Sequence, residues 1–246
     1  MKRSLFFSGL KFWEKSVVEV PSVLAITLAA LGALGSTGGA LHAAQVGETI
    51  VFDNSIPVKD AGGSQVNYRW PLEFGDEIEL EGIARDVIEF KVDPALVGTT
   101  FPNANFVVRF YKNDGADVDP GLKVILGPGS LLWESAAQPI STGAGFVTLA
   151  VPGITVPKTF TWTIQYANVN NTDAGGLVLG DPIGVGKSFN DFWRKKEADG
   201  AWENVIFQGS PLKANFVAQV TAVPEPTTLA LVVIGGGLFL ALRRRL

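Results

Sequence analysis

Two tryptophans in this sequence stand beside polar side chains that could bind a sugar. Trp70 follows Arg69, and Trp193 lies two residues after Asp191. The C–H face of a sugar ring packs well on an indole, while charged side chains hydrogen-bond to its hydroxyls. These four residues are therefore candidate glycan-binding residues. The alternative for each tryptophan is burial in the core of the domain.

The acidic segment 73–81 is a second candidate, because two carboxylates can hydrolyse a glycosidic bond, one as acid and one as base or nucleophile. A carbohydrate-active hydrolase would use acids such as Asp76 or Glu77. However, Glu77, Glu79 and Glu81 alternate with apolar residues, which is typical of the exposed face of a strand. A solvated edge strand explains this pattern better, so we expect a domain without catalytic activity.

Oxygen-bearing side chains also gather in the loop 113–119, at Asn113, Asp114, Asp117 and Asp119. Calcium takes about six to eight oxygen ligands, so a calcium site is conceivable here. The spacing differs from that of a helix-loop-helix calcium site, and a solvated hairpin turn explains the composition better. We expect neither a bound metal nor another cofactor.

Composition excludes several other classes of site. Cysteine is absent and the single histidine, His42, lies in the N-terminal leader described below, so the domain cannot contain a Ser-His-Asp triad or a zinc site with thiolate or imidazole ligands. Residues 45–222 carry 21 acidic and 13 basic side chains, a net charge of −8. Because only residues 194–196 form a basic cluster, we do not expect nucleic acid as a partner.

Alternating apolar and polar residues dominate the central part of the chain. In the segment 159–166, Phe160, Trp162, Ile164 and Tyr166 alternate with threonines and a glutamine, which predicts a strand with one buried and one solvated face. The same reasoning predicts further strands at 65–70, 77–81, 87–92, 105–112, 122–126, 131–135, 145–151, 202–208 and 214–220.

These strands are short, and no long amphipathic helix separates them. Residues 168–186, rich in glycine, asparagine and aspartate, predict a long surface connection that holds a short strand at 177–179. The sequence therefore predicts an all-β domain, an antiparallel β-sandwich of jelly-roll type, flanked by an N-terminal signal helix and a C-terminal transmembrane sorting helix.

The last 24 residues contain three parts in order: Val223, Pro224, Glu225 and Pro226; the apolar run Leu229 to Leu242; and the cluster Arg243, Arg244 and Arg245. The prolines favour an extended backbone that presents the carboxylate. The apolar run has 14 residues, fewer than the roughly 20 that cross a bilayer, which suits a temporary stop in the membrane. The arginines favour the cytoplasmic side.

This order of parts closely resembles the PEP-CTERM sorting signal of Gram-negative bacteria, and the resemblance is confined to residues 223–246. It implies that the protein is a substrate of exosortase, an integral membrane peptidase that cuts near Pro-Glu-Pro, and that it contacts the inner membrane only transiently. Species with this signal commonly make exopolysaccharide and biofilm. An ordinary C-terminal membrane anchor with an accidental Pro-Glu-Pro is the alternative.

The N-terminus has the features of a secretory signal peptide. Basic residues between Lys2 and Lys15 precede an apolar stretch at 23–34 and small residues at 35–40 and 43–44. An uncleaved N-terminal membrane helix is the alternative. The chain thus divides into a signal peptide (1–44), an exported β-domain (45–222) and a sorting signal (223–246).

Together these features predict an exported protein of the cell envelope, the cell surface or the extracellular matrix. Its non-catalytic domain would bind polysaccharide or serve a structural or adhesive role. A hydrolase secreted into an exopolysaccharide matrix is the alternative function.

Overall fold

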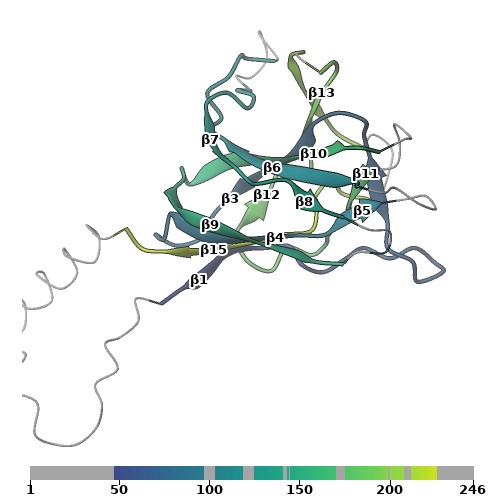
Figure 1. Ribbon diagram of the computed structural model, residues 1–246. Coiled ribbons are helices and arrows are strands. Elements are labelled where there is room, and N and C mark those ends of the chain that lie inside the picture. The colour runs from purple at the N-terminus through teal and green to yellow at the C-terminus, as the bar shows by residue number, and fades with distance from the viewer. Residues whose placement is uncertain are drawn as a thin grey trace, which may run out of the picture. The chain divides into compact units, whose positions relative to one another are not determined.

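The computed structural model describes residues 47–96, 103–118, 125–140, 143, 145–169, 175–198, 200–207 and 212–225 (Figure 1). All of them belong to the unit Gln45–Leu246. The predicted signal peptide, the apolar run 229–242 and the three terminal arginines lie outside the described residues. Within the described ranges every regular element is a strand, and all strand pairs are antiparallel, which confirms the predicted all-β class.

The described residues contain fifteen strands in three sheets. The strands are β1 (Thr49–Asp53), β2 (Asn67–Arg69), β3 (Phe74–Glu79), β4 (Asp86–Val92), β5 (Pro94–Leu96), β6 (Asn105–Tyr111), β7 (Leu131–Glu134), β8 (Gln138–Pro139), β9 (Val147–Thr155), β10 (Thr159–Ala167), β11 (Gly175–Val178), β12 (Lys187–Ser188), β13 (Phe192–Lys195), β14 (Trp202–Val205) and β15 (Ala218–Val223). The sheet orders are β1-β15-β4-β9, β14-β13-β3-β10-β6-β7 with β12 beside β3 and β8 beside β6, and β2-β11-β5.

Aromatic side chains join the four-stranded sheet to the eight-stranded one. Phe90 of β4 lies with its ring centroid 5.1 Å from that of Phe110 in β6 and 5.1 Å from that of Trp162 in β10. All three side chains are fully buried. Burying one such side chain contributes roughly 1.5–3 kcal/mol, and a core of this kind explains how a domain without disulfides stays folded.

The second face of β10 is not solvated as its alternation predicts. Phe160, Trp162 and Ile164 face the core as expected, but Thr161 and Thr163 on the opposite face are also fully buried. Asn113 and Glu73 cover them, since Thr161 Oγ1 donates to Asn113 Oδ1 at 2.8 Å and Thr163 Oγ1 donates to Glu73 Oε1 at 2.6 Å. The eight-stranded sheet therefore carries a buried polar layer over its outer face.

Strand β3 lies inside the eight-stranded sheet and not at its edge, which corrects the edge prediction for the acidic segment. It pairs with β10 on one side and with β13 and β12 on the other. Gly75 makes this packing possible, because a Cβ at this position would lie 1.9 Å from the carbonyl oxygen of Trp162. The exposed or half-exposed positions of Glu77, Glu79 and Glu81 agree with the predicted alternation.

Two further strand predictions need correction. Residues 175–180, expected on the surface, are all buried, and a Cβ at Gly175 would lie 2.5 Å from the ring of Tyr166. The short strand predicted at 177–179 is present as β11, one residue earlier at its end, but it is buried and not on the surface. In the predicted strand 122–126, Leu126 makes only an isolated bridge with Asp117, and residues 122–124 lie outside the described ranges.

The first and last strands run side by side in the four-stranded sheet (Figure 1). Thr49 at the start of β1 pairs with Ala222 near the end of β15. β15 was expected at 214–220 but runs to Val223, where it pairs with Asp86 of β4. Pro224 follows, and because proline has no N–H to donate, the ladder ends there.

Candidate functional site

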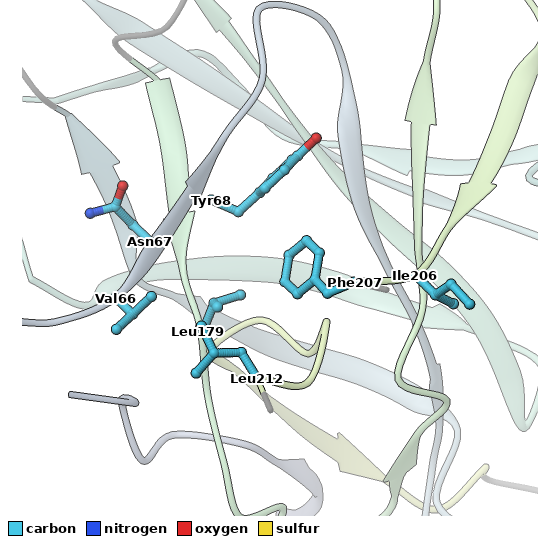
Figure 2. A pocket seen from close by; sticks show the side chains of 7 residues that line it. All are labelled: Val66, Asn67, Tyr68, Leu179, Ile206, Phe207 and Leu212. Carbon is cyan, nitrogen blue, oxygen red and sulfur yellow. The ribbon is translucent and has the colours of Figure 1, made fainter. Parts of the chain in front are cut away.

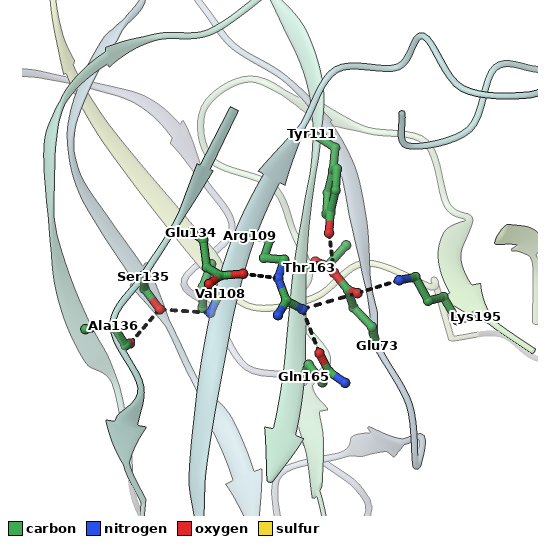
Figure 3. Close-up of polar contacts among 10 residues, drawn as sticks. All are labelled: Glu73, Val108, Arg109, Tyr111, Glu134, Ser135, Ala136, Thr163, Gln165 and Lys195. Carbon is green, nitrogen blue, oxygen red and sulfur yellow. Dashed lines mark hydrogen bonds and ion pairs between the residues drawn. The ribbon is translucent and has the colours of Figure 1, made fainter. Parts of the chain in front are cut away.

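A buried carboxylate on the outer face of the eight-stranded sheet gathers side chains from three strands, β6, β10 and β13 (Figure 3). Glu73 stands just before β3, and its side chain is 2% exposed. Its Oε1 accepts hydrogen bonds from the Tyr111 hydroxyl at 2.9 Å and from Thr163. Its Oε2 pairs with Lys195 Nζ at 3.0 Å and with Arg109 Nη1 at 3.3 Å. We call these five residues the Glu73 cluster.

The Glu73 cluster keeps its carboxylate charged. Burial alone would raise the pKa of Glu73, but hydrogen bonds from Thr163 and Lys195, with the charges of Arg109 and Lys195, outweigh burial and hold it below its ordinary value. Burial and the charge of Glu73 raise the pKa of Tyr111, so the phenol stays protonated and donates. Each carboxylate oxygen of Glu73 contacts two donor groups. This geometry therefore suits a cross-link between strands and not acid–base chemistry.

Asp76 on β3 is the centre of a second buried polar group. It is fully buried, and its two oxygens each lie 3.1 Å from Ser188 Oγ, while Phe216 N–H donates to Oδ2 at 3.2 Å. Ser188 Oγ also lies 2.9 Å from Asn215 Oδ1. Burial raises the pKa of Asp76 well above its ordinary value. A neutral Asp76 fits this arrangement, because it can donate to Ser188, whose single hydrogen then goes to Asn215.

We expect Asp76→Asn to increase the free energy of unfolding at neutral pH, since asparagine keeps the hydrogen bonds and does not ionise in the unfolded chain. The raised folded pKa means that wild-type stability falls as pH rises from the ordinary aspartate range toward that pKa, and Asp76→Asn should remove this slope. Asp76→Ala should instead lower stability by about 1–3 kcal/mol, because Phe216 N–H loses its acceptor. Urea unfolding at several pH values measures the free energy of unfolding of the wild type and the two variants. An equal dependence on pH for wild type and Asp76→Asn would contradict a neutral Asp76.

A cavity of about 610 Å³ opens beside these buried groups, and we call it the Asp191 pocket. It is lined by Glu77, Asn113, Ile125, Leu126, Thr159, Phe189 and Asp191. Glu77 comes from β3, Thr159 from the start of β10, Asn113 and Leu126 from the β6–β7 connection, and Asp191 from the segment before β13. Phe189 is 45% exposed. The pocket thus combines an accessible aromatic ring with carboxylate, amide and hydroxyl groups, which is the chemistry that binds a sugar.

Of the four predicted glycan-binding residues, only Asp191 lines this pocket. Trp193 is fully buried, and a Cβ at Gly127 would lie 3.2 Å from its ring, so the β6–β7 connection covers it. Trp193 is therefore buried beneath this connection and lies outside the main hydrophobic cluster, to which its neighbour Phe192 belongs. One face of Trp70 is covered by the Arg194 guanidinium, 4.0 Å from the ring centroid, and its Nε1 donates to Lys195 O at 2.8 Å. Arg69 is exposed on β2.

Phe189 supplies the aromatic ring of the pocket, whereas sequence reasoning preferred Trp193 and Trp70 as binding residues. It belongs to the same aromatic segment as Trp193, and nothing in the residue types distinguishes the exposed ring from the buried one. The difference arises from the β6–β7 connection, which covers Trp193 and leaves Phe189 at the pocket.

The predicted calcium ligands bind neighbouring backbone and hydroxyl groups. Asp114 accepts from Ser130 N at 2.6 Å and from Ser130 Oγ at 2.8 Å, and Asp117 accepts from Ile125 N at 3.0 Å. Hydrogen bonds from Ser130 lower the pKa of Asp114. Asp119 lies outside the described residues. Within the described ranges no group of three acidic or histidine side chains is placed to hold a metal ion.

The acids of the alternative hydrolase do not form a catalytic pair. Asp76 and Glu77 are neighbours on one strand, so their side chains point to opposite faces of the sheet. Asp76 is sealed among Ser188, Asn215 and Phe216, whereas Glu77 lines the Asp191 pocket and accepts from Trp193 Nε1 at 3.4 Å. A substrate in the pocket could therefore reach only one of the two carboxyl groups.

A second cavity, of about 470 Å³, is mainly apolar (Figure 2). Its lining residues are Val66, Asn67, Tyr68, Leu179, Ile206, Phe207 and Leu212. The Phe207 ring lies 5.6 Å from that of Tyr68 and 5.5 Å from that of Phe192, and the Tyr68 hydroxyl accepts from Arg194 at 2.8 Å. This groove is the open margin of an aromatic cluster and offers few polar groups to orient a ligand.

The described residues include the first three residues of the predicted sorting motif. Val223 ends β15, and Pro224 and Glu225 follow it half-buried. Pro226 and Arg243 to Arg245 lie outside the described ranges, as does the predicted transmembrane helix. None of the described residues forms a helix of the length and apolarity needed to cross a bilayer.

Comparison with known proteins gave no relative. No protein-family model, curated protein or solved structure matches the chain significantly.

Proposed function

We propose that this chain is an exported envelope or extracellular-matrix protein of a Gram-negative bacterium, which a PEP-CTERM signal delivers to an exosortase-type membrane peptidase. The observation that carries the proposal is the order of Pro-Glu-Pro, apolar run and arginine cluster at residues 223–246. Its position supports the same reading, because β15 ends at Val223 and the motif begins where the sheet stops. A peptidase could then cut the chain without unfolding the domain.

Mass spectrometry of the exported protein tests this proposal most directly. The expected mature form has lost its signal peptide and ends near residue 226. Extracellular protein that still ends at Leu246 would contradict the sorting proposal.

The delivered domain, in this proposal, is a non-catalytic antiparallel β-sandwich of jelly-roll type. The contacts of Phe90 across the two larger sheets support a two-layer arrangement. The sealed position of Asp76 argues against the hydrolase alternative. The Asp191 pocket supports polysaccharide binding, with a structural or adhesive role if no glycan binds.

We expect Phe189→Ala to weaken binding of a polysaccharide by about fivefold, or about 1 kcal/mol, because the pocket loses its exposed ring. A glycan array followed by pull-down with the fragment 45–225, which keeps all of β15, measures this effect. Phe146→Ala is the matched control, because Phe146 is 47% exposed and does not line the pocket. Equal losses in the two variants would remove the assignment of the pocket.

A further inference from the structure

The Asp191 pocket presents two carboxylates and, among the described residues that line it, no basic side chain. Glu77 and Asp191 supply the carboxylates from separate segments, β3 and the residues before β13. Burial is the main cause of the raised pKa of Asp76, and the negative charges of Asp191 and Glu77 add to it, so both carboxylates lie near the same buried group. A ligand in this pocket therefore meets negative charge from two segments of the chain.

Three described lysines lie one or two positions from lining residues in the chain, and acids outside the lining act on each of them. Lys158 and Lys187 both pair with Glu79 Oε1, at 2.7 Å and 3.3 Å. The charge of Lys112 acts on Asp114. The positive charge around the pocket is thus directed to other acids, and the lining keeps its acidic character.

The polar lining groups favour a ligand that donates hydrogen bonds to the two carboxylates. Glu77 is oriented by Trp193, whose Nε1 donates to its Oε2 at 3.4 Å. Asn113 Oδ1 accepts from Thr161 Oγ1 at 2.8 Å, so the Asn113 amide can offer its N–H groups to a ligand. A carboxylate accepts only, and its hydrogen bond with a charged donor is roughly twice as strong as one between neutral groups. A protonated amine is the donor that fits this lining best.

The residue between Phe189 and Asp191 holds both in place. Asn190 has a φ of 61°, in the left-handed region that asparagine adopts more readily than most residues. Its N–H donates to Asn215 Oδ1 at 3.2 Å, and its Oδ1 accepts from Ala214 N at 2.9 Å. The aromatic ring and the carboxylate therefore stand on a fixed turn, so binding a sugar requires less ordering of this segment.

We propose that the Asp191 pocket selects a cationic amino-sugar polymer, with protonated amines, over N-acetylated and uronic-acid polymers. This inference rests on the proposed polysaccharide binding and names its substrate class. Phe189 packs on the C–H face of any sugar, whereas Glu77 and Asp191 determine specificity by binding the ammonium group. The carboxylates of a uronic acid would meet two like charges and be repelled.

Calorimetry of the full chain tests this selection, with the protein purified in a detergent that has no sugar headgroup. The three probes are a glucosamine oligomer, its fully N-acetylated form and a uronic-acid oligomer of the same length, at low salt and at mildly acidic pH, where the amines are protonated. We expect the glucosamine oligomer to bind about tenfold more tightly than the N-acetylated one, because its amines donate charge-assisted hydrogen bonds. The uronic-acid oligomer should bind most weakly.

Variants of the lining separate charge from packing. Glu77→Gln keeps the shape and an acceptor for Trp193, and we expect it to reduce the tenfold preference to about threefold or less while leaving the N-acetylated oligomer unaffected. Asp191→Asn should act in the same way. Glu197→Gln is the matched control, because it changes the net charge equally at an exposed position outside the lining, and it should keep the wild-type preference. Phe189→Ala should weaken both oligomers by a similar factor.

The outcomes distinguish the selection from glycan binding itself. If the N-acetylated or the uronic-acid oligomer binds as tightly as the glucosamine oligomer, the selection is wrong while polysaccharide binding stands. If Glu197→Gln reduces the preference as much as Glu77→Gln does, the net charge of the domain and not the pocket causes it, which also overturns the inference. If none of the three oligomers and no glycan of an array binds, the proposed polysaccharide binding fails and the selection fails with it.

Discussion

Replacing Glu73 with alanine is expected to lower the free energy of unfolding by about 3 kcal/mol, the low end of the range for breaking a buried ion pair. Arg109 and Lys195 would lose their shared carboxylate, and the Tyr111 hydroxyl and Thr163 would lose an acceptor. The arginine and lysine side chains are 19% and 22% exposed, so water compensates part of the loss. Urea unfolding of the fragment 45–225 measures the difference.

Two companion variants sharpen this test. Glu134→Gln is the control, because Glu134 also pairs with Arg109 but is 48% exposed, and its loss should cost less than about 1 kcal/mol. Glu73→Gln keeps the shape and removes the charge. Because the folded pKa of Glu73 is lowered, its stabilisation is present above the ordinary glutamate range and is lost as pH falls through the folded pKa. If the free energy of unfolding falls at low pH as steeply in Glu73→Gln as in wild type, other carboxylates cause the loss of stability.

Glu225→Ala is expected to stop the release of the protein, reducing the mature extracellular form by at least about tenfold and leaving a longer precursor in the inner membrane. A tenfold loss corresponds to about 1.4 kcal/mol of recognition free energy, a modest requirement for a charged group. Fractionation followed by immunoblotting and mass spectrometry measures precursor and product.

Glu197→Ala is the matched control, because Glu197 is an exposed glutamate on the domain and should leave release unchanged. Release of Glu225→Ala at the wild-type rate would mean that the peptidase does not recognise this glutamate. The resemblance to a sorting signal would then not support the proposed function.

The fold class followed from the sequence because alternation survives wherever one face of a strand meets the core. Phe160, Trp162 and Ile164 are buried as predicted. The same alternation failed for Thr161 and Thr163, because a polar residue on the second face is solvated only if nothing covers it. Glu73 covers Thr163 from the residue before β3, and that contact is a property of the tertiary structure.

The candidate site was less accessible to sequence reasoning. Asp191 was identified, but the ring that accompanies it in the pocket is Phe189 and not Trp193. The charged partners of Glu73 are distant in the chain, Arg109 on β6 and Lys195 on β13, and only strand order brings them together. Glycine composition was also misleading, since Gly175 serves close packing inside the domain and not a loop.

The pairing of Thr49 with Ala222 determines how the domain responds to mechanical tension between its two ends. Because β1 begins beside the end of β15, a force that pulls these ends apart loads the hydrogen bonds of this pair one after another and not all at once. β1 would peel away at low force. β15 is held by β4 as well as by β1, so it should resist until the remaining sheet gives way.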